Sequence, residues 1–231
     1  MILFVAAEPR ECEPWVAHWN RVRFVKLPVH WCRAGMWKGA EVMAIANGAG
    51  PERAYAAVHI TVGAAPALAA VCNIGFCGAL DPSLGIGDIF VATEVRNGIR
   101  TFRADTPPGC RAHKTGTLAS RPRIAQTAAE KRNLFSSGAF AVDMEAAGAA
   151  RASEELSVPF YCIRVVSDLA DEDFANDFNR CIKPDGRFSI GSLLLGAMAS
   201  PVGRFGELIR LSKRTALAAR NLGDFLAHCD F

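Results

Sequence analysis

With 231 residues, of which 51% are hydrophobic, the chain is long enough to form one domain with a substantial core. Its 26 Lys and Arg residues against 23 Asp and Glu residues leave a net charge of +3, too small for the basic surface that nucleic-acid binding requires. The eight cysteines form no CxxC pair and no regular spacing. We therefore expect a single domain over residues 1–231, no nucleic-acid partner, no disulfide framework, no metal site and a reducing, cytoplasmic compartment.

The first predicted element is a strand at Ile2–Ala6, an apolar run that Glu8 and Glu11 follow directly. A signal peptide would carry a basic leader, which this segment lacks. Four further runs predict strands at Val42–Asn47, Ala70–Ile74, Asp88–Glu94 and Phe160–Val166. Ala-rich stretches predict helices at Pro51–Val62, Arg123–Leu134, Met144–Leu156 and Gly206–Ala227. Their alternation is typical of an α/β domain whose strands are covered by helices on both faces.

Three further segments have a distinctive composition. Asn97–His113 contains Pro107-Pro108-Gly109 and predicts a surface loop. Ile190–Gly203 is apolar but interrupted by Gly, Ser and Pro, and it is too short to span a membrane. Arg204–Arg220 has five basic residues and one acidic residue among its leucines. It is expected to be a packed terminal helix with a solvated basic face, or alternatively a helix that lies on a membrane surface.

Candidate binding residues lie where the predicted strands end. Glu11 follows the first strand, where a parallel sheet opens its ligand crevice, although charge at a helix N-terminus is an alternative role. Glycine-rich turns at 47–51 and 73–80 follow the next two strands, and such turns allow close backbone approach to a ligand. Two glycine-rich turns at strand ends in one domain favour a ligand crevice, but they do not identify the ligand.

The most informative segment is Ala141–Ala147, in which an acidic pair opens a helix, followed by the strand Tyr161–Asp168. Glu145 and Asp168, with Arg164 between them in sequence, suggest acid and base chemistry. In the alternative interpretation, Glu145 is helix-start charge and Arg164 forms a structural pair with Asp168.

Taken in order, these blocks resemble the purine nucleoside phosphorylase superfamily. The matching segments are Ile2 to Glu11, Gly48-Ala49-Gly50, Asn73-Ile74-Gly75 to Asp88, Gly116–Ser120, Val142-Asp143-Met144-Glu145-Ala146 and Arg164–Asp171. Within the superfamily the chain is similar to the methylthioadenosine/S-adenosylhomocysteine nucleosidases. The tail and the segment Ala119–Lys131 look more like hopanoid-associated members, whose proposed task is to remove adenine from adenosylhopane, and the same superfamily includes futalosine hydrolase. The resemblance implies a three-layer αβα sandwich around a central twisted mixed sheet.

It also implies catalytic roles for three carboxyl groups. Asp168 would protonate or hydrogen-bond N7 of the purine, Glu145 would bind the ribose hydroxyls, and Glu11 would deprotonate the attacking water. Around the substrate, Met144 would pack on the sugar, Gly75 and Phe76 would contact the substrate, and Arg164 and Ser167 would hold Asp168 in place.

Hydrolysis is expected rather than phosphorolysis. The phosphate-binding Arg and Ser or Thr of the hexameric phosphorylases are replaced here by Asn73 and Phe76, and a Phe cannot bond a phosphate oxygen. We therefore expect a nucleosidase that releases the base of a purine nucleoside, expected to be a 5′-substituted adenosine. A phosphorylase is the first alternative and a non-catalytic nucleoside-binding protein the second. The resemblance implies a homo-oligomer without a cofactor, and the basic C-terminal helix suggests peripheral membrane contact.

Overall fold

The computed structural model describes residues 1–64, 67–189, 191 and 201–231, with the side chains of residues 201 and 202 excepted. The strands are β1 (Ile2–Ala6), β2 (Asn20–Phe24), β3 (Trp31–Trp37), β4 (Ala40–Ala46), β5 (Ala70–Ala79), β6 (Ile89–Arg96), β7 (Thr101–Arg103), β8 (Lys114–Ser120), β9 (Ala141–Asp143) and β10 (Phe160–Asp168). The helices are α1 (Pro9–Val16), α2 (Pro51–Val62), α3 (Ala128–Ser136), α4 (Ala146–Leu156), the 3-10 helix η1 (Phe178–Cys181) and α6 (Pro201–Leu226).

All five predicted strands and all four predicted helices are present; β1 and α2 have the predicted bounds, and the other elements have shifted ends. β5 continues five residues beyond the predicted end at Ile74, to Ala79. α3 begins at Ala128 instead of Arg123, because the Thr127 side chain accepts a bond from the Glu130 N–H group and Glu130 bonds back to the Thr127 N–H group. The predicted surface loop 97–113 contains β7, and the predictions missed α1, β2, β3, β8 and β9.

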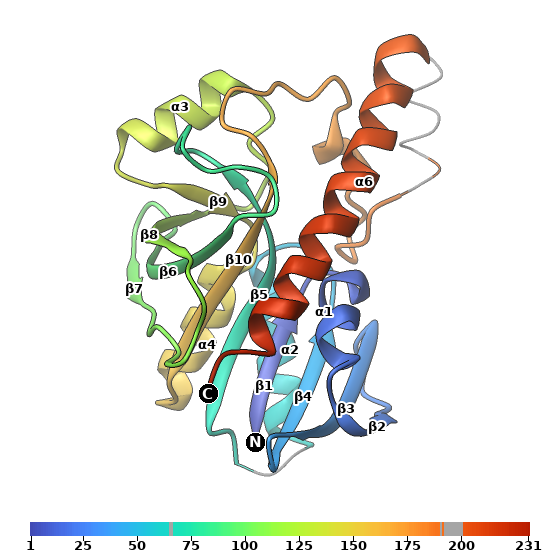
Figure 1. Ribbon diagram of the computed structural model, residues 1–231, viewed down its shortest axis with the longest axis vertical. Coiled ribbons are helices and arrows are strands. Elements are labelled where there is room, and N and C mark those ends of the chain that lie inside the picture. Colours follow the sequence, from blue (N-terminus) through green and yellow to red (C-terminus); the bar gives the residue numbers. More distant parts are fainter. Residues whose placement is uncertain (65–66, 190, 192–200) are drawn as a thin grey trace.

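Within the described residues, ten strands form one mixed sheet in the order β10-β6-β8-β9-β5-β1-β4-β3-β2, with β7 paired to β6 (Figure 1). The central pairs β4–β1, β1–β5 and β5–β10 are parallel, so these strands end at the same edge. β10 also pairs with β6 in antiparallel orientation, which closes β5, β10, β6, β8 and β9 into a ring. The mixed sheet of the expected fold class is thus confirmed.

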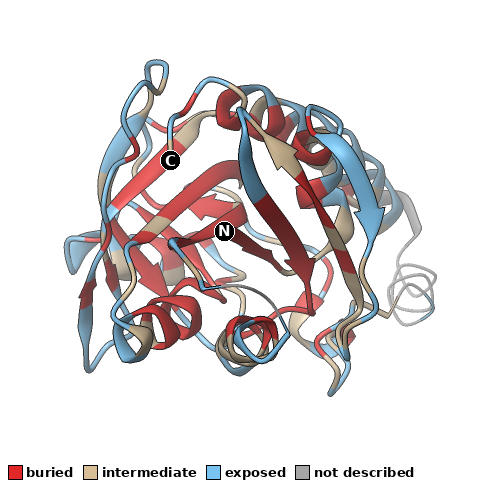
Figure 2. Cartoon of the chain, turned by 90° about the horizontal axis from the view of Figure 1, so that it is seen from below, coloured by how far each residue is buried: buried red, intermediate tan, exposed pale blue. Residues whose placement is uncertain are grey.

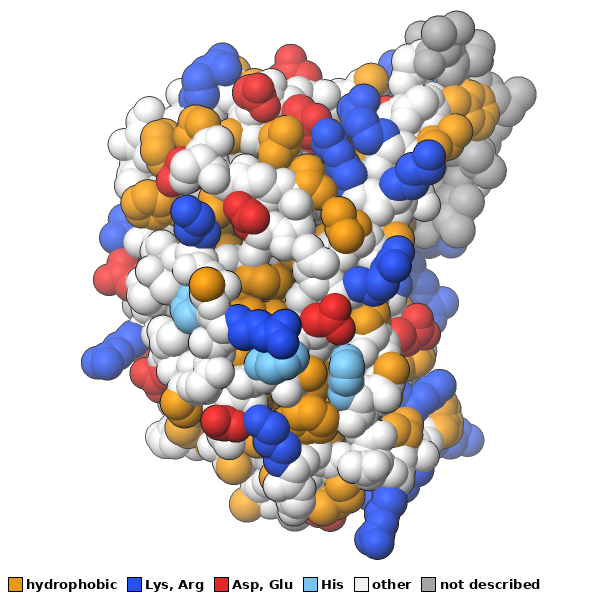
Figure 3. All heavy atoms as spheres, in the orientation of Figure 1, with side chains coloured by type: hydrophobic (Ala, Val, Ile, Leu, Met, Phe, Trp, Pro, Cys, Tyr) orange, Lys and Arg blue, Asp and Glu red, His pale blue; other side chains and the backbone are white. Residues whose placement is uncertain are grey.

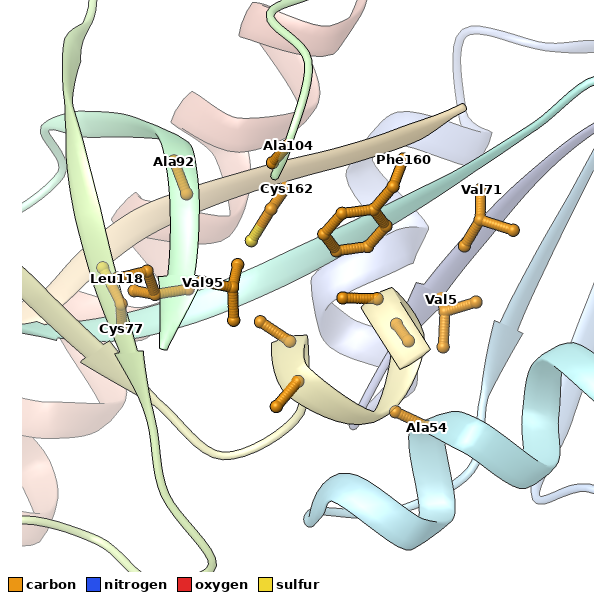
Figure 4. Close-up of a cluster of buried hydrophobic side chains, with 14 of the residues drawn as sticks. Val5, Ala54, Val71, Cys77, Ala92, Val95, Ala104, Leu118, Phe160 and Cys162 are labelled. Atoms are coloured by element: carbon orange, nitrogen blue, oxygen red, sulfur yellow. The ribbon is translucent and has the colours of Figure 1, made fainter. Parts of the chain in front are cut away.

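Helices cover both faces of this sheet. One buried cluster joins strand residues such as Val5 and Val71 to Ala54 of α2 and to the alanines of α4 (Figure 4). A second cluster, on the opposite face, joins Phe4 to Trp15 of α1 and Leu222 of α6. Figure 2 shows these buried residues running through the sheet, with exposed residues on the outer surface. The three-layer arrangement that the resemblance implied is therefore confirmed.

One cysteine prediction is wrong. Cys110 and Cys229 form a disulfide, whereas Cys12, Cys32, Cys72, Cys77, Cys162 and Cys181 are free and buried. The pair lies 119 residues apart in sequence, so no spacing pattern could reveal it. The cysteine content consequently no longer supports a reducing compartment.

The apolar stretch Ile190–Gly203 lies largely outside the described residues, at 190 and 192–200. The helix that follows it, α6, packs its buried residues against the sheet and leaves Arg210, Lys213 and Arg220 exposed. Figure 3 shows Lys and Arg side chains along α6 in this view. No helix in the part of the chain that the structure describes has both the length and the apolar character needed to cross a bilayer.

Candidate active site

A cavity of about 680 Å³ opens beside the carboxyl ends of β1, β5 and β10. Parallel strands bring their carboxyl ends to one edge of a sheet, where α/β proteins bind small ligands. The lining includes the carboxyl groups of Glu11, Glu145 and Asp168. Its apolar part is formed by Phe76, Ile124, Val142, Met144, Phe174, Phe178, Phe188, Leu208 and Leu211. The predicted catalytic carboxyl groups therefore share a single cavity.

Glu11 lies on the first turn of α1, directly after β1, and it is buried. Its Oε2 accepts bonds from the backbone N–H groups of Ala7, at 3.0 Å, and Glu8, at 2.7 Å. Its Oε1 accepts the N–H group of Phe76 from β5, at 2.8 Å. The helix-capping role and the cavity-lining position thus belong to the same side chain. Burial is the main cause that raises the pKa of Glu11, and the nearby Glu8 adds to it.

Glu145 follows β9 and precedes α4, and its Oε1 accepts the N–H group of Gly50 at 3.0 Å. Beside it, Asp143 Oδ2 accepts the N–H groups of Glu145, at 3.1 Å, and Ala146, at 2.8 Å. Burial and, after it, the neighbouring Asp143 carboxylate raise the pKa of Glu145 to about 8. Asp143 therefore fixes the start of α4 and with it the position of Glu145.

Arg164 is fully buried on β10, and its hydrogen-bond partners are Asn73 and Asp143. The prediction that Arg164 holds Asp168 is therefore wrong about the partner. The prediction for Ser167 is in keeping with the geometry, because its hydroxyl lies 2.9 Å from Asp168 Oδ1 and 3.1 Å from the carbonyl oxygen of Cys77. Burial lowers the pKa of Arg164, but the Asp143 carboxylate and the other nearby groups that favour a positive charge outweigh it and raise the pKa, so the guanidinium stays charged.

Asp168 ends β10 and is bonded from two sides. Lys131 of α3, fully buried, donates to its Oδ2 at 2.6 Å, and the same ammonium group donates to the carbonyl oxygen of Leu169 at 2.6 Å. Burial is the main cause that raises the pKa of Asp168, and the Lys131 charge opposes that rise. Asp168 therefore combines cavity exposure with a fixed position, which a proton-donating group requires.

Two glycines of β5 allow the carboxyl groups to come this close to the strand. A Cβ at Gly75 would lie 2.5 Å from Oε1 of Glu11, and Gly75 has a φ of +144°, which side chains rarely adopt. A Cβ at Gly78 would lie 2.7 Å from Oδ2 of Asp168. Gly75 does not line the cavity, which differs from the expected contact between Gly75 and the substrate. Its lack of a side chain instead leaves room for the carboxyl group of Glu11.

The other glycine-rich exit, at 47–51, uses its N–H groups within the protein. Gly48 donates to Ala7, Ala49 to Gly186 and Gly50 to Glu145. These N–H groups are therefore already paired within the protein, and the turn orients Glu145. Among the described residues, no group of three or more His, Cys, Asp or Glu side chains is arranged to hold a metal ion.

Sequence reasoning missed Lys131 and the aromatic side chains at 174, 178 and 188. Lys131 stands in the charged run Glu130-Lys131-Arg132, which is typical of a solvated helix face. Only its pairing with Asp168, 37 positions away, reveals its burial. Three Phe residues within 15 positions were a sequence signal for an apolar pocket. They follow the last block of the resemblance, where no role was assigned.

A mixed sheet whose strand ends carry buried carboxyl groups into one partly apolar cavity defines an α/β protein with a pocket of the size that encloses a small molecule. The chain belongs to the phosphorylase superfamily, whose family model matches residues 5–113 and 109–183. The 5′-methylthioadenosine/S-adenosylhomocysteine nucleosidase of Pseudoalteromonas translucida is 28% identical over 143 residues, 49% of this chain and 61% of that protein. The match thus spans less than two thirds of that relative's length.

Solved structures share the fold over nearly the whole chain. The nucleosidase of the same name from Neisseria meningitidis, in complex with methylthio-immucillin-A, has a TM-score of 0.74 and 21% identity, and the match covers 98% of this chain and 96% of that one. The futalosine hydrolase of Helicobacter pylori has a TM-score of 0.71 and 18% identity, with 97% and 94% covered. The superfamily assignment made from the sequence motifs is confirmed.

Proposed function

We propose that the chain is an N-glycosidic bond hydrolase, a nucleosidase that releases the free base of a purine nucleoside. The observation that carries the proposal is the convergence of Glu11, Glu145 and Asp168 on one cavity. The names of the relatives, which are nucleosidases, support the same enzyme class. We also propose that residues 1–231 form one domain, because the superfamily match and the continuous sheet both run through most of the chain.

The proposed reaction assigns one task to each carboxyl group. Asp168 gives a proton to N7 of the purine as the C1′–N9 bond breaks and its electron pair passes to the base. Glu145 accepts hydrogen bonds from the ribose hydroxyls, with Met144 against the sugar. Glu11 takes a proton from the water whose oxygen bonds to C1′. Each positioned proton transfer contributes about 10²–10⁴-fold to the rate.

Water is the proposed nucleophile because the side chains that would hold phosphate are occupied. The Asn73 amide donates to the carbonyl oxygen of Val5 at 2.8 Å and accepts a bond from Arg164. Arg10, the cation nearest Glu11 in sequence, pairs with Glu8 and lies over the Phe76 ring, 5.5 Å from its centre. The first alternative, a phosphorylase, would need a cation released from these partners.

The aromatic part of the cavity favours a nucleoside with an apolar 5′ substituent. Phe174, Phe178 and Phe188 line it together with Leu208 and Leu211 of α6, and a cavity of about 680 Å³ has the size of a site that encloses a whole small molecule. We propose that this wall contacts the group at C5′. A methylthio group and a hopanoid chain are both apolar, and the assay below distinguishes them.

The test is release of free base from a panel of purine nucleosides, with and without phosphate. The panel contains adenosine, methylthioadenosine, adenosylhopane, futalosine and inosine. Release that does not depend on phosphate supports the proposal. Asp168→Asn should lower it by about 10²–10⁴-fold. Asp171→Asn, which changes an exposed acid three residues further on, should leave it unchanged. Ribose 1-phosphate as product would assign the chain to the phosphorylases. Binding without release from any substrate would favour the second alternative, a non-catalytic nucleoside-binding protein.

Two partner predictions stay predictions. The exposed basic residues of α6 are expected to contact anionic lipid, at about 1 kcal/mol for each Lys or Arg near the surface, and sedimentation with anionic liposomes tests this. A homo-oligomer is expected from the resemblance, and light scattering of the purified chain tests it. A protein that stays in the supernatant and prefers methylthioadenosine would contradict the hopanoid assignment and leave the nucleosidase proposal intact.

A further inference from the structure

Lys131 is a buried charge that the proposed reaction does not yet use. Its side chain is fully enclosed, and its ammonium group bonds to Asp168 Oδ2 and to the carbonyl oxygen of Leu169, both at 2.6 Å. The ring of Phe174 lies 5.1 Å away on another side. Lys131 does not line the cavity, whereas Asp168 does. The carboxyl group therefore stands between the ammonium group and the cavity.

Fold stability alone gives a weak reason for this arrangement. Removing a lysine ammonium group from water is costly, and well-packed apolar side chains of similar volume often stabilise such a position as well or better. A purely structural tie between α3 and β10 would not need its carboxylate to be exposed to a ligand cavity. The position of the pair, at the cavity wall, points to the chemistry of Asp168.

We propose that Lys131 is a positioning residue that stabilises the carboxylate left when Asp168 gives its proton to the departing base. This inference rests on the proposed nucleosidase function. During the step, the electron pair of the C1′–N9 bond passes to the base, and the Asp168 proton moves to N7. The carboxylate formed keeps the Lys131 bond at Oδ2, so its new charge is paired at once. Glu11 takes the proton of the attacking water, and exchange with solvent restores the proton on Asp168.

Without the cation, the buried carboxyl group would hold its proton too strongly to act as an acid. Burial raises the pKa of a carboxyl group, because it favours the neutral acid. An opposite charge in contact lowers that pKa by about 1–3. Ser167 also donates toward Oδ1, at 2.9 Å, but a hydroxyl group carries no net charge. Lys131 is thus the side chain that brings the acid strength of Asp168 back toward the range in which proton transfer is fast.

The other charged groups around the pair are already partnered. Glu172, in the segment after β10, bonds to Arg214 of α6 at 2.7 and 2.9 Å. Asp173 accepts the N–H group of Ala128 at the start of α3, at 2.6 Å. On α3 itself, Glu130 pairs with Arg123 at 2.7 Å. Glu172 acts on Asp168 in the direction opposite to Lys131, so these neighbours do not replace the lysine charge.

The experiment compares the pH dependence of kcat/KM for the parent chain, Lys131→Met and Lys131→Arg. Activity declines on the alkaline side as Asp168 loses its proton, and Lys131→Met should move this decline upward by about 1–3 pH units, because the carboxylate has lost its cation. Lys131→Arg should restore the parent profile. Lys114→Met, which removes an exposed lysine, should leave the profile unchanged. If Lys131→Met does not fold, Lys131→Gln keeps a hydrogen-bond donor without the charge and should give the same shift.

A second comparison isolates the route through Asp168. In a chain that carries Asp168→Asn, adding Lys131→Met should not change the residual rate, because the group on which the lysine acts is gone. A lowered rate with an unchanged alkaline decline would make Lys131 a structural residue and overturn the inference. Absence of base release from the parent chain would contradict the proposed function itself. An active parent with an unchanged Lys131→Met profile contradicts only the role of the lysine.

Discussion

Replacing Glu145 with Gln removes a titrating group from the cavity and keeps the shape of the side chain. The amide oxygen can still accept the Gly50 N–H bond that Oε1 accepts at 3.0 Å. Burial, with Asp143 alongside, raises the pKa of Glu145 from its ordinary 4.5 to about 8. Between these values the folded chain keeps a proton that the unfolded chain has lost. The parent and Glu145→Gln should therefore differ in how their stability depends on pH.

The sign and the size of this difference follow from proton linkage. Where the folded state binds more protons, the free energy of unfolding falls as pH rises, by about 1.4 kcal/mol for each pH unit. For Glu145 this amounts to a loss of about 3–4 kcal/mol between about pH 5 and about pH 8. Below the unfolded-state pKa both states are protonated, so the two proteins should have similar stability there. At alkaline pH, Glu145→Gln should be the more stable protein.

Urea unfolding at a series of pH values measures this directly. Glu41→Gln, at an exposed position on β4, serves as the control and should follow the parent at every pH. The same Glu145→Gln protein should lose most base release, because the amide puts an NH2 group, which can only donate, where a carboxyl oxygen would accept a bond from a ribose hydroxyl. Parallel stability curves for parent and Glu145→Gln would refute the assignment of a retained proton to Glu145.

Three further outcomes are expected. Asp168→Asn should fold and lower turnover by about 10²–10⁴-fold, and near-normal kcat/KM on a good substrate would contradict its role. Glu11→Gln should be almost inactive, in assays whose parent rate does not change with added phosphate. Gly75→Ala should lower the free energy of unfolding by about 1–3 kcal/mol, measured by thermal unfolding. The alanine Cβ would lie 2.5 Å from Oε1 of Glu11, and the backbone φ at this position is +144°. An unchanged melting temperature would contradict this reading of β5.

The sequence predicted the central strands well because their residues are buried on both faces. β1 and β5 read as continuous apolar runs, a pattern that few other local structures share. α1 was missed because it has only eight residues and contains Pro9 and Pro14, so its apolar period is short. Its stability comes from the reciprocal bonds of Glu8 and Glu11 at its first turn, which composition does not reveal.

The site could be predicted only where its residues share a block of sequence. Glu145 and Asp168 stand in blocks that the superfamily resemblance identifies, and both line the cavity. Lys131 could not be found in this way, because its contact with Asp168 depends on how α3 packs against the end of β10. For Arg164, the sequence indicated the burial but not the partner. Its burial was foreseeable from β10, but its partner, Asp143, lies on β9 in the folded sheet.

The charged side chains around the cavity support the proposed hydrolysis over phosphorolysis. Its lining holds six acidic side chains, at positions 8, 11, 13, 143, 145 and 168, and two cations, Arg10 and Arg123. Arg10 pairs with Glu8, and Arg123 pairs with Glu130 at 2.7 Å. A phosphate anion entering this cavity would meet mainly acidic side chains, and both cations of the described lining are already paired. We expect the carboxyl oxygens of this lining to stabilise a ribosyl group that gains positive charge as its base departs. We therefore expect neutral water, and not phosphate, to attack the sugar.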